Sequence, residues 1–232
     1  MVLSVQALSV RRGGSTVLDN IDLELRPAEL VALIGANGSG KTTLLRALSG
    51  TIDPSGGAVV LLGQDVTHAA AEAAVRGGLA HVPEGRRLFE GLTVRENLIL
   101  GGWRTRTDDI EPALSILPEL IPLLGQRAGT LSGAHAQLCA VGRALVADPA
   151  VLLIDEISLG LAPQAIARLL MLLPDLASLG VSVLFIEQDV GRALSIADRV
   201  YLLDRGHVAR SGQPGELLAD PDFVRLHVNG LF

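Results

Sequence analysis

The chain has 232 residues, of which 49% are hydrophobic and 19% are charged, and its formal net charge is −6. This length suffices for one domain with a full hydrophobic core, and the acidic balance argues against a nucleic-acid-binding protein, which is expected to carry a basic face. No apolar run reaches the roughly 18 residues that cross a bilayer, and the N-terminus lacks a signal-peptide pattern. The single cysteine, Cys139, cannot form an internal disulfide. We therefore expect a soluble chain in the cytosol.

Alternation of apolar and polar residues predicts half-buried antiparallel strands over 4–10 and 21–25. Short continuous apolar runs predict fully buried strands of a parallel sheet that helices cover on both faces. These runs lie at 30–34, 151–154 and 181–186. Helical patterns follow or separate the strands, and Thr93 and Glu96 form a capping-box pattern at the start of one of them. The helical patterns lie at 41–49, 93–101, 110–124, 132–147, 163–179 and 189–197. Residues 201–208 predict a late hairpin.

This order of strands and helices predicts an α/β fold. Residues 84–147 show helical patterns but no convincing buried strand. We therefore expect a single domain over 1–232. Its α/β core, with an N-terminal antiparallel β subdomain, would be made of 1–83 and 148–232, and 84–147 would form an inserted α-helical subdomain.

A glycine-rich segment between a buried strand and a helix matches the pattern G-x-x-x-x-G-K-[ST]. Its residues are Gly35, Ala36, Asn37, Gly38, Ser39, Gly40, Lys41 and Thr42, followed by Thr43. Glycines let successive backbone N–H groups point at phosphate oxygens, and the N-terminus of the helix adds to the attraction. Lys41, the only lysine of the chain, would reach the β- and γ-phosphates of ATP, and the Thr42 hydroxyl would ligate Mg²⁺. The sequence therefore predicts an ATP site at this loop.

Two carboxylates follow the buried strand at 151–154. Asp155 is expected to hold Mg²⁺ through water, and Glu156 to polarise the attacking water as a general base or orienting group. With the phosphate loop, this pair predicts an Mg-dependent ATPase.

Between these two motifs, residues 131–137 read LSGAHAQ and open a predicted helix. Their order and spacing resemble the signature of the ATP-binding cassette (ABC) ATPase family, and the resemblance covers essentially the whole chain. It implies a P-loop NTPase core that pairs head to tail with a second ABC ATPase subunit, identical or different. In such a pair the signature of one subunit contacts ATP held by the other. The signature residues implied here are Leu131, Ser132, Gly133, Ala134 and Gln137.

Further segments are similar to one branch of that family, the LivF-type ATPases of branched-chain amino acid importers. These segments lie at 82–89, 92–98, 158–163 and 186–188. The resemblance implies a subunit that couples ATP hydrolysis to uptake of branched-chain or related amino acids. It also implies membrane permease subunits as partners, indirectly a solute-binding protein, and a peripheral position on the cytoplasmic face of the cell membrane. By the same resemblance, Glu84 would be a further Mg²⁺ ligand and Gln188 would contact the γ-phosphate.

The chain departs from the family pattern at several positions. Ala134 replaces the second glycine of the signature, where a methyl group crowds the partner's phosphate and any positive φ would be strained. His135 and Ala136 follow in place of polar residues. Arg12 stands where an aromatic side chain usually stacks on adenine, and could itself stack on the base. Ile157 replaces a proline, and we have no functional account of it.

Three other hypotheses remain open at this point. The altered signature suits an ATP-gated module with weak or no hydrolysis of its own. The transported solute could be urea or a short amide instead of an amino acid. Soluble ABC ATPases that work on DNA or in translation form another class, but they usually carry two cassettes or a long coiled-coil insertion, for which 232 residues leave no room.

Overall fold

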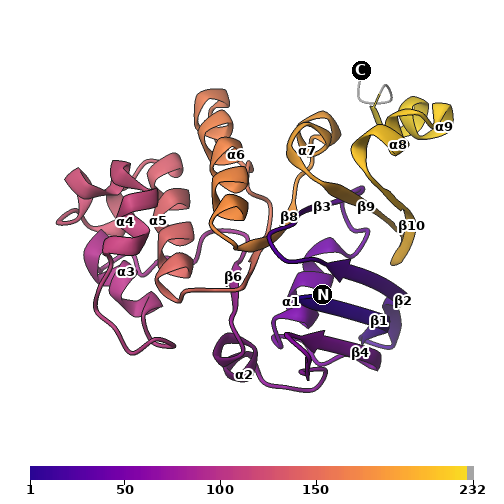
Figure 1. Ribbon diagram of the computed structural model, residues 1–232, viewed down its shortest axis with the longest axis horizontal. Coiled ribbons are helices and arrows are strands. Elements are labelled where there is room, and N and C mark those ends of the chain that lie inside the picture. The colour runs from indigo at the N-terminus through magenta and orange to yellow at the C-terminus, as the bar shows by residue number, and fades with distance from the viewer. Residues whose placement is uncertain (229–232) are drawn as a thin grey trace.

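The computed structural model describes residues 1–228, which form two sheets with helices around them (Figure 1). A four-stranded antiparallel sheet has the order β2-β1-β4-β5. Its strands are β1 (Leu3–Arg12), β2 (Ser15–Leu25), β4 (Gly56–Leu61) and β5 (Gln64–Asp65). A six-stranded sheet has the order β10-β9-β3-β8-β7-β6, and all its neighbours pair in parallel except β10 with β9. Its strands are β3 (Leu30–Ile34), β6 (Leu79–Val82), β7 (Val151–Ile154), β8 (Ser182–Ile186), β9 (Arg199–Asp204) and β10 (His207–Gly212).

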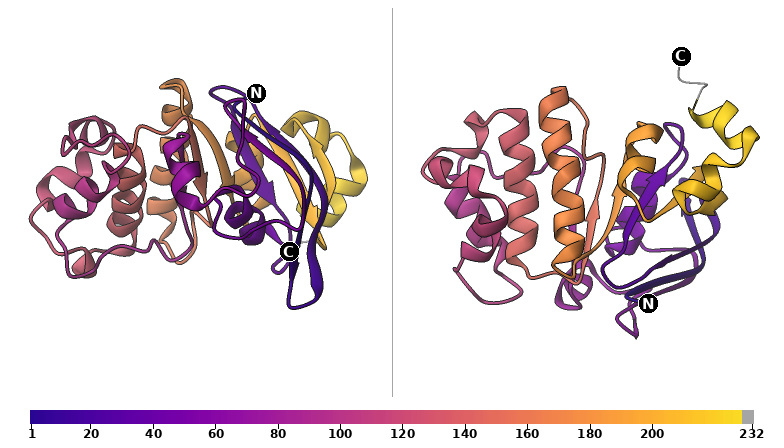
Figure 2. Two further views of the ribbon diagram at one scale, coloured as in Figure 1. Left: turned by 90° about the horizontal axis from the view of Figure 1, so that it is seen from below. Right: turned by 45° about the horizontal axis from the view of Figure 1, so that its top comes forward.

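The central strands of the parallel sheet are buried on both faces, as their continuous apolar runs predict. Successive side chains of a strand point to opposite faces, so each strand contributes to two separate cores. In β3, Leu30, Ala32 and Ile34 belong to one core, and Val31 and Leu33 belong to the other. The first core includes side chains of α5 (Gly133–Val146) and α6 (Pro163–Ser178), which lie next to each other in Figure 2, and the second includes those of α1 (Lys41–Leu48) and the antiparallel sheet. The phosphate loop therefore continues from a strand that is packed on both sides.

Helices fill the segment between β6 and β7 and form one end of the molecule in Figure 1. They are α3 (Val94–Gly101), α4 (Glu111–Ile116), the 3₁₀ helices η1 (Pro118–Leu123) and η2 (Ala128–Thr130), and α5. The predicted capping box is confirmed, because Thr93 Oγ1 accepts from the Glu96 N–H at 3.2 Å while Glu96 Oε2 accepts from the Thr93 N–H at 2.7 Å. The boundaries 84 and 147 of this subdomain stay a prediction.

One predicted helix is wrong in part. The helix over 110–124 breaks at Leu117 (φ −123°, ψ 61°) and continues as a 3₁₀ helix, because Pro118 lacks an N–H and disfavours the helical conformation in the residue before it. The hairpin over 201–208 is confirmed as β9 and β10. No sequence pattern predicted β4, β5, β6 or α2 (Ala71–Arg76).

The remaining helices are short and near the C-terminus. They are α7 (Val190–Ile196), α8 (Pro214–Leu218), α9 (Pro221–Phe223) and a π-helical turn over Val224–Val228. Within residues 1–228, none of the helices combines the length and apolar character required to span a membrane.

Candidate ATP site

The phosphate loop joins β3 to α1 and depends on glycine at two close approaches. Gly35 has φ +147°, and a Cβ there would collide with the backbone oxygen of Leu203 on β9. Gly40 has φ +109°, and a Cβ there would lie 2.7 Å from Leu18 Cδ2 on β2. Because an L side chain fits neither the φ value nor the space, the loop can pack between the two sheets only with glycine at these positions.

The Lys41 side chain lies inside this loop, with an exposed fraction of 5%. Its Nζ donates to the backbone oxygens of Gly35 at 2.7 Å and of Ala36 at 3.0 Å. Burial lowers the pKa of Lys41, while the charges of Glu156 and Asp155 act to raise it. The backbone of the loop thus holds the ammonium group of Lys41 within the loop, where its positive charge can bind an anion.

Other polar groups of the loop are left for a ligand. The Ser39 hydroxyl is buried and has no hydrogen-bond partner within residues 1–228. Gly40 precedes α1 and offers no side chain to cap the helix, so the N–H groups of its first turn receive no side-chain cap. An orphaned hydroxyl, uncapped amides and an ammonium group form a donor set that fits the oxygens of a phosphate chain.

Asp155 ends β7 and lies against the start of α1, where the Thr42 hydroxyl donates to its Oδ1 at 3.2 Å. Its exposed fraction is 2%. Burial raises the pKa of Asp155 to about 6; the Thr42 hydrogen bond opposes this, and the charges of Glu156 and Glu84 add to it. The Thr42 hydroxyl and the Asp155 carboxylate are oxygen donors of the kind that Mg²⁺ takes, although the described residues include no group of three or more His, Cys, Asp or Glu side chains placed to share a metal ion. A divalent cation would offset the repulsion that the charges of Glu156 and Glu84 exert on Asp155. The residues present therefore fit the expected metal.

Glu156 has a left-handed backbone conformation, with φ +48°. Its Oε1 accepts a hydrogen bond of 2.9 Å from Nε2 of Gln188, which follows β8. Glu156 lines two cavities. One, of about 150 Å³, is otherwise lined by Val17, Asn37, Gly38, Gly40, Lys41, Thr42 and Thr43, and the other, of about 400 Å³, contains Gln188. The structure thus brings the phosphate loop, Glu156 and Gln188 together.

Arg12, the residue expected to contact adenine, lies away from the phosphate-loop cavity. Arg12 is exposed beside the turn of the β1–β2 hairpin, where it pairs with Ser15, and among the described residues it is not one that lines the 150 Å³ cavity. Val17 on β2 does line that cavity, although no sequence pattern predicted it. No motif marks Val17, because only the packing of β2 against Gly40 brings it there.

The signature residues lie at the start of α5. Ser132 is the N-cap, and its Oγ accepts from the N–H of His135 at 3.3 Å. Ala134 lies within the helix and is absent from the positive-φ residues of the described chain, so its methyl group causes no backbone strain. Gln137 is buried, and its Oε1 accepts from Nε of Arg86 at 3.2 Å. Of the described residues, those lining the 150 Å³ cavity include none from 131–137, so this segment is separate from the chain's own phosphate loop.

Comparison with known proteins agrees with this geometry. Residues 18–158 match the profile of the ABC transporter family. The chain is 39% identical to the high-affinity branched-chain amino acid transport ATP-binding protein BraG of Pseudomonas aeruginosa, over 99% of this chain and 100% of BraG. It is 35% identical to the probable branched-chain amino acid transport ATP-binding protein LivF of Archaeoglobus fulgidus, over 90% of this chain and 91% of that protein.

Solved structures of ABC transporter cassettes have the same fold as this chain. A nucleotide-free ATP-binding cassette from an ABC transporter superposes with a TM-score of 0.86 at 25% identity, covering 97% of this chain and 98% of that one. The ATP-binding subunit of an ABC transporter superposes with a TM-score of 0.87 at 26% identity, covering 100% of this chain and 98% of that one. The predicted P-loop NTPase fold of the ABC type is confirmed, and the chain belongs to the ABC transporter family.

Proposed function

We propose that this chain is the ATP-binding and ATP-hydrolysing subunit of an ABC importer for branched-chain or related amino acids. One observation carries the proposal: the buried Lys41 and Asp155 meet Thr42 and Glu156 at the carboxyl edge of the parallel sheet. The solute is proposed from the relatives, because BraG and LivF are both named as branched-chain amino acid transport ATP-binding proteins. Their similarity favours this solute over urea or short amides.

The chemistry follows from the position of each side chain. Lys41 and the loop amides would bind the β- and γ-phosphates of ATP. Thr42, Asp155 and Glu84 would hold Mg²⁺, which neutralises charge on the phosphate oxygens. Glu156 would orient a water molecule for attack on the γ-phosphorus and take up its proton, while the bond to the bridging oxygen breaks to give ADP and phosphate. Gln188, which donates to Glu156, would hold that carboxylate in line and contact the γ-phosphate.

A second subunit completes the site in this proposal. The start of α5, with Leu131, Ser132, Gly133, Ala134 and Gln137, would contact ATP bound to a partner cassette, since it does not line the chain's own phosphate-loop cavity. The helical geometry at Ala134 is compatible with such a contact as far as the backbone is concerned, because Ala134 has no positive φ; its methyl group still adds bulk that a glycine would not.

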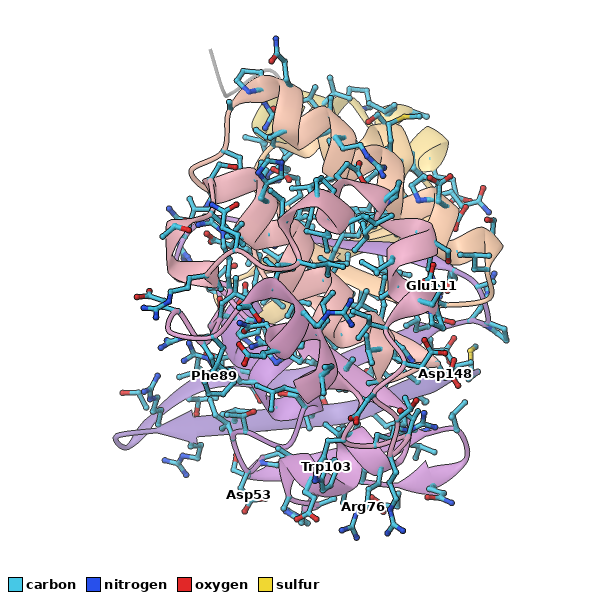
Figure 3. All side chains as sticks on the ribbon, turned by 90° about the vertical axis from the view of Figure 1, so that its left-hand side faces the viewer. Asp53, Arg76, Phe89, Trp103, Glu111 and Asp148 are labelled. Carbon is cyan, nitrogen blue, oxygen red and sulfur yellow. The ribbon has the colours of Figure 1, made fainter. Side chains whose placement is uncertain are left out.

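A membrane permease is the other proposed partner, on the cytoplasmic face of the membrane. Phe89 and Trp103 are large apolar side chains with exposed fractions of 56% and 53% (Figure 3). They line a hollow of about 420 Å³. Arg76 lies over the Trp103 ring and Arg143 over the Phe89 ring, at 5.5 and 5.9 Å. An apolar hollow with arginines at its rim suits a docked segment of another protein, and Trp103→Ala is expected to weaken co-purification with the permease.

A second candidate function is an ATP-gated module with little hydrolysis. The observation that favours it is the engagement of the signature serine, whose Oγ lies 3.1 Å from Nδ1 of His135. A Ser132 hydroxyl that bonds to His135 is less available to a partner's phosphate.

The experiment that separates the two functions is Mg-ATP turnover of the purified chain, with nucleotide binding measured in parallel. We expect wild-type turnover, loss of at least about 100-fold in Glu156→Gln with binding retained, and loss on chelation of Mg²⁺. Glu111→Gln, an exposed carboxylate at the start of α4, is the matched control and retains turnover. Binding without turnover in all three proteins would favour the gated module.

A further inference from the structure

Glu187 directly follows β8 and is completely enclosed, with an exposed fraction of 0%. Its Oε1 accepts three hydrogen bonds: one from the Ser158 hydroxyl at 2.8 Å, and one each from the N–H groups of Gln188 and Asp189 at 3.0 Å. Its Oε2 is buried without a hydrogen-bond partner within the described part of the chain. A buried carboxylate is costly unless it is bonded, so a carboxylate at this position calls for a role beyond packing.

The three donors come from two different loops. Ser158 belongs to the loop after β7, two residues beyond Glu156, whereas Gln188 and Asp189 belong to the loop after β8. A backbone hydrogen bond of 3.3 Å from the Ile157 N–H to the Ile186 oxygen joins the same two segments. Glu187 is therefore a buried side chain that ties the two loops together at the edge of the parallel sheet.

The hydrogen bonds of Glu187 reach Glu156 from two directions, through Ser158 and through Gln188. On one side, the Ser158 hydroxyl anchors the chain that leaves Glu156. On the other side, Glu187 fixes the backbone of Gln188, whose side chain donates to Glu156 Oε1 at 2.9 Å. Glu156 also holds a left-handed conformation, φ +48°, which residues with a side chain keep only where the surroundings enforce it.

We propose that Glu187 is a positioning residue for ATP hydrolysis, which clamps the loop after β7 to the loop after β8 and so holds the Glu156 carboxylate in its working orientation. The inference rests on the proposed function, since it assigns Glu156 as the group that acts on water. Glu187 acts through Ser158 and Gln188, and the phosphate loop is outside this network.

Ser158→Ala is the most selective test, because it removes one half-buried hydroxyl and leaves Glu187 and Glu156 intact. We expect kcat to fall about tenfold, the scale of one lost hydrogen bond to a charged group, with the KM for ATP unchanged within about twofold. Ser158→Thr keeps the hydroxyl and restores kcat. Glu187→Gln is expected to lower kcat in the same way. If Glu187→Gln prevents folding because Glu187 is buried, Ser158→Ala still tests the clamp.

Two comparisons distinguish positioning from a general structural effect. In a Glu156→Gln background, adding Ser158→Ala leaves the residual turnover unchanged, because no carboxylate remains to be positioned. Ser195→Ala is the matched control: this exposed hydroxyl on α7 donates only to the Arg192 oxygen of its own helix, at 2.7 Å, and the substitution retains wild-type kcat.

Wild-type kcat in Ser158→Ala would overturn the inference, and so would an equal fall in kcat with and without Glu156. A rise in KM at constant kcat would overturn it as well, since that result assigns the clamp to nucleotide binding. A wild-type chain that binds ATP without turnover overturns the proposed hydrolysis itself, and the inference with it.

Discussion

His81 on β6 makes the stability of this fold sensitive to mild acid. Its Nδ1 lies 3.1 Å from the Ser49 hydroxyl, and its Nε2 is buried with no hydrogen-bond partner within residues 1–228. Burial and the nearby charge of Arg46 lower the pKa of His81 from 6.5 to about 4. Because the folded state resists the proton that the unfolded state accepts, the stabilisation is complete above pH 6.5 and is lost as the pH falls toward 4.

The magnitude follows from the two pKa values. At pH 5 the unfolded histidine is almost fully protonated and the folded one is mostly neutral, so proton binding favours unfolding by about 2 kcal/mol. A side chain that does not titrate, as in His81→Gln, removes this pH-dependent contribution. Any change that the substitution makes to the unfolding free energy at neutral pH is the same at pH 5 and cancels in the comparison.

Urea unfolding at pH 7 and pH 5 measures the effect. Between these two values, the wild type should lose about 2 kcal/mol more unfolding free energy than His81→Gln does. Equal losses in the two proteins would refute the reasoning, because they would show that His81 titrates alike in the folded and unfolded chains.

Three further substitutions test the local physics. Gly35→Ala forces a Cβ into the Leu203 carbonyl at φ +147°, so we expect at least about 3 kcal/mol of destabilisation and loss of ATP binding; a well-folded variant that binds ATP would contradict this. Thr93→Ala removes the cap of α3 and should cost about 1 kcal/mol in urea unfolding, whereas an unchanged midpoint would show that the cap contributes nothing. Glu29→Ala leaves the guanidinium of Arg199, whose side chain is 15% exposed, without its carboxylate partner at 2.8 Å and with only the Glu24 oxygen at 3.0 Å, so about 2 kcal/mol should be lost, and a loss below about 0.5 kcal/mol would mean that water replaces the carboxylate.

The sequence predicted best what is encoded locally. The loop from Gly35 to Thr42 is a contiguous motif that requires a strand before it and a helix after it, and both are present at the predicted positions. The capping box at Thr93 and the carboxylates after β7 are short-range patterns of the same kind.

What the sequence did not predict depends on contacts between distant segments. The four residues of β6 form a strand because they pair with β7, from Leu79 opposite Val151 to Val82 opposite Ile154, and the polar His81 interrupts their apolar pattern. Val17 reaches the phosphate-loop cavity only because β2 packs on Gly40. The clamp at Glu187 likewise joins residues 29 positions apart, which no single motif contains.

Cys139, the single cysteine of the chain, can report when α5 opens. The thiol has no exposed surface on α5, and burial raises its pKa to about 11, against a smaller opposing effect of Arg143. Both properties block attack by thiol reagents while α5 stays packed, since the thiolate is the reactive form. The thiol can therefore be modified only when α5 opens, and the rate of modification measures how often α5 opens. Because the chain has one cysteine, the unaltered protein can report the opening of the segment that begins with its signature, with nucleotide or without it.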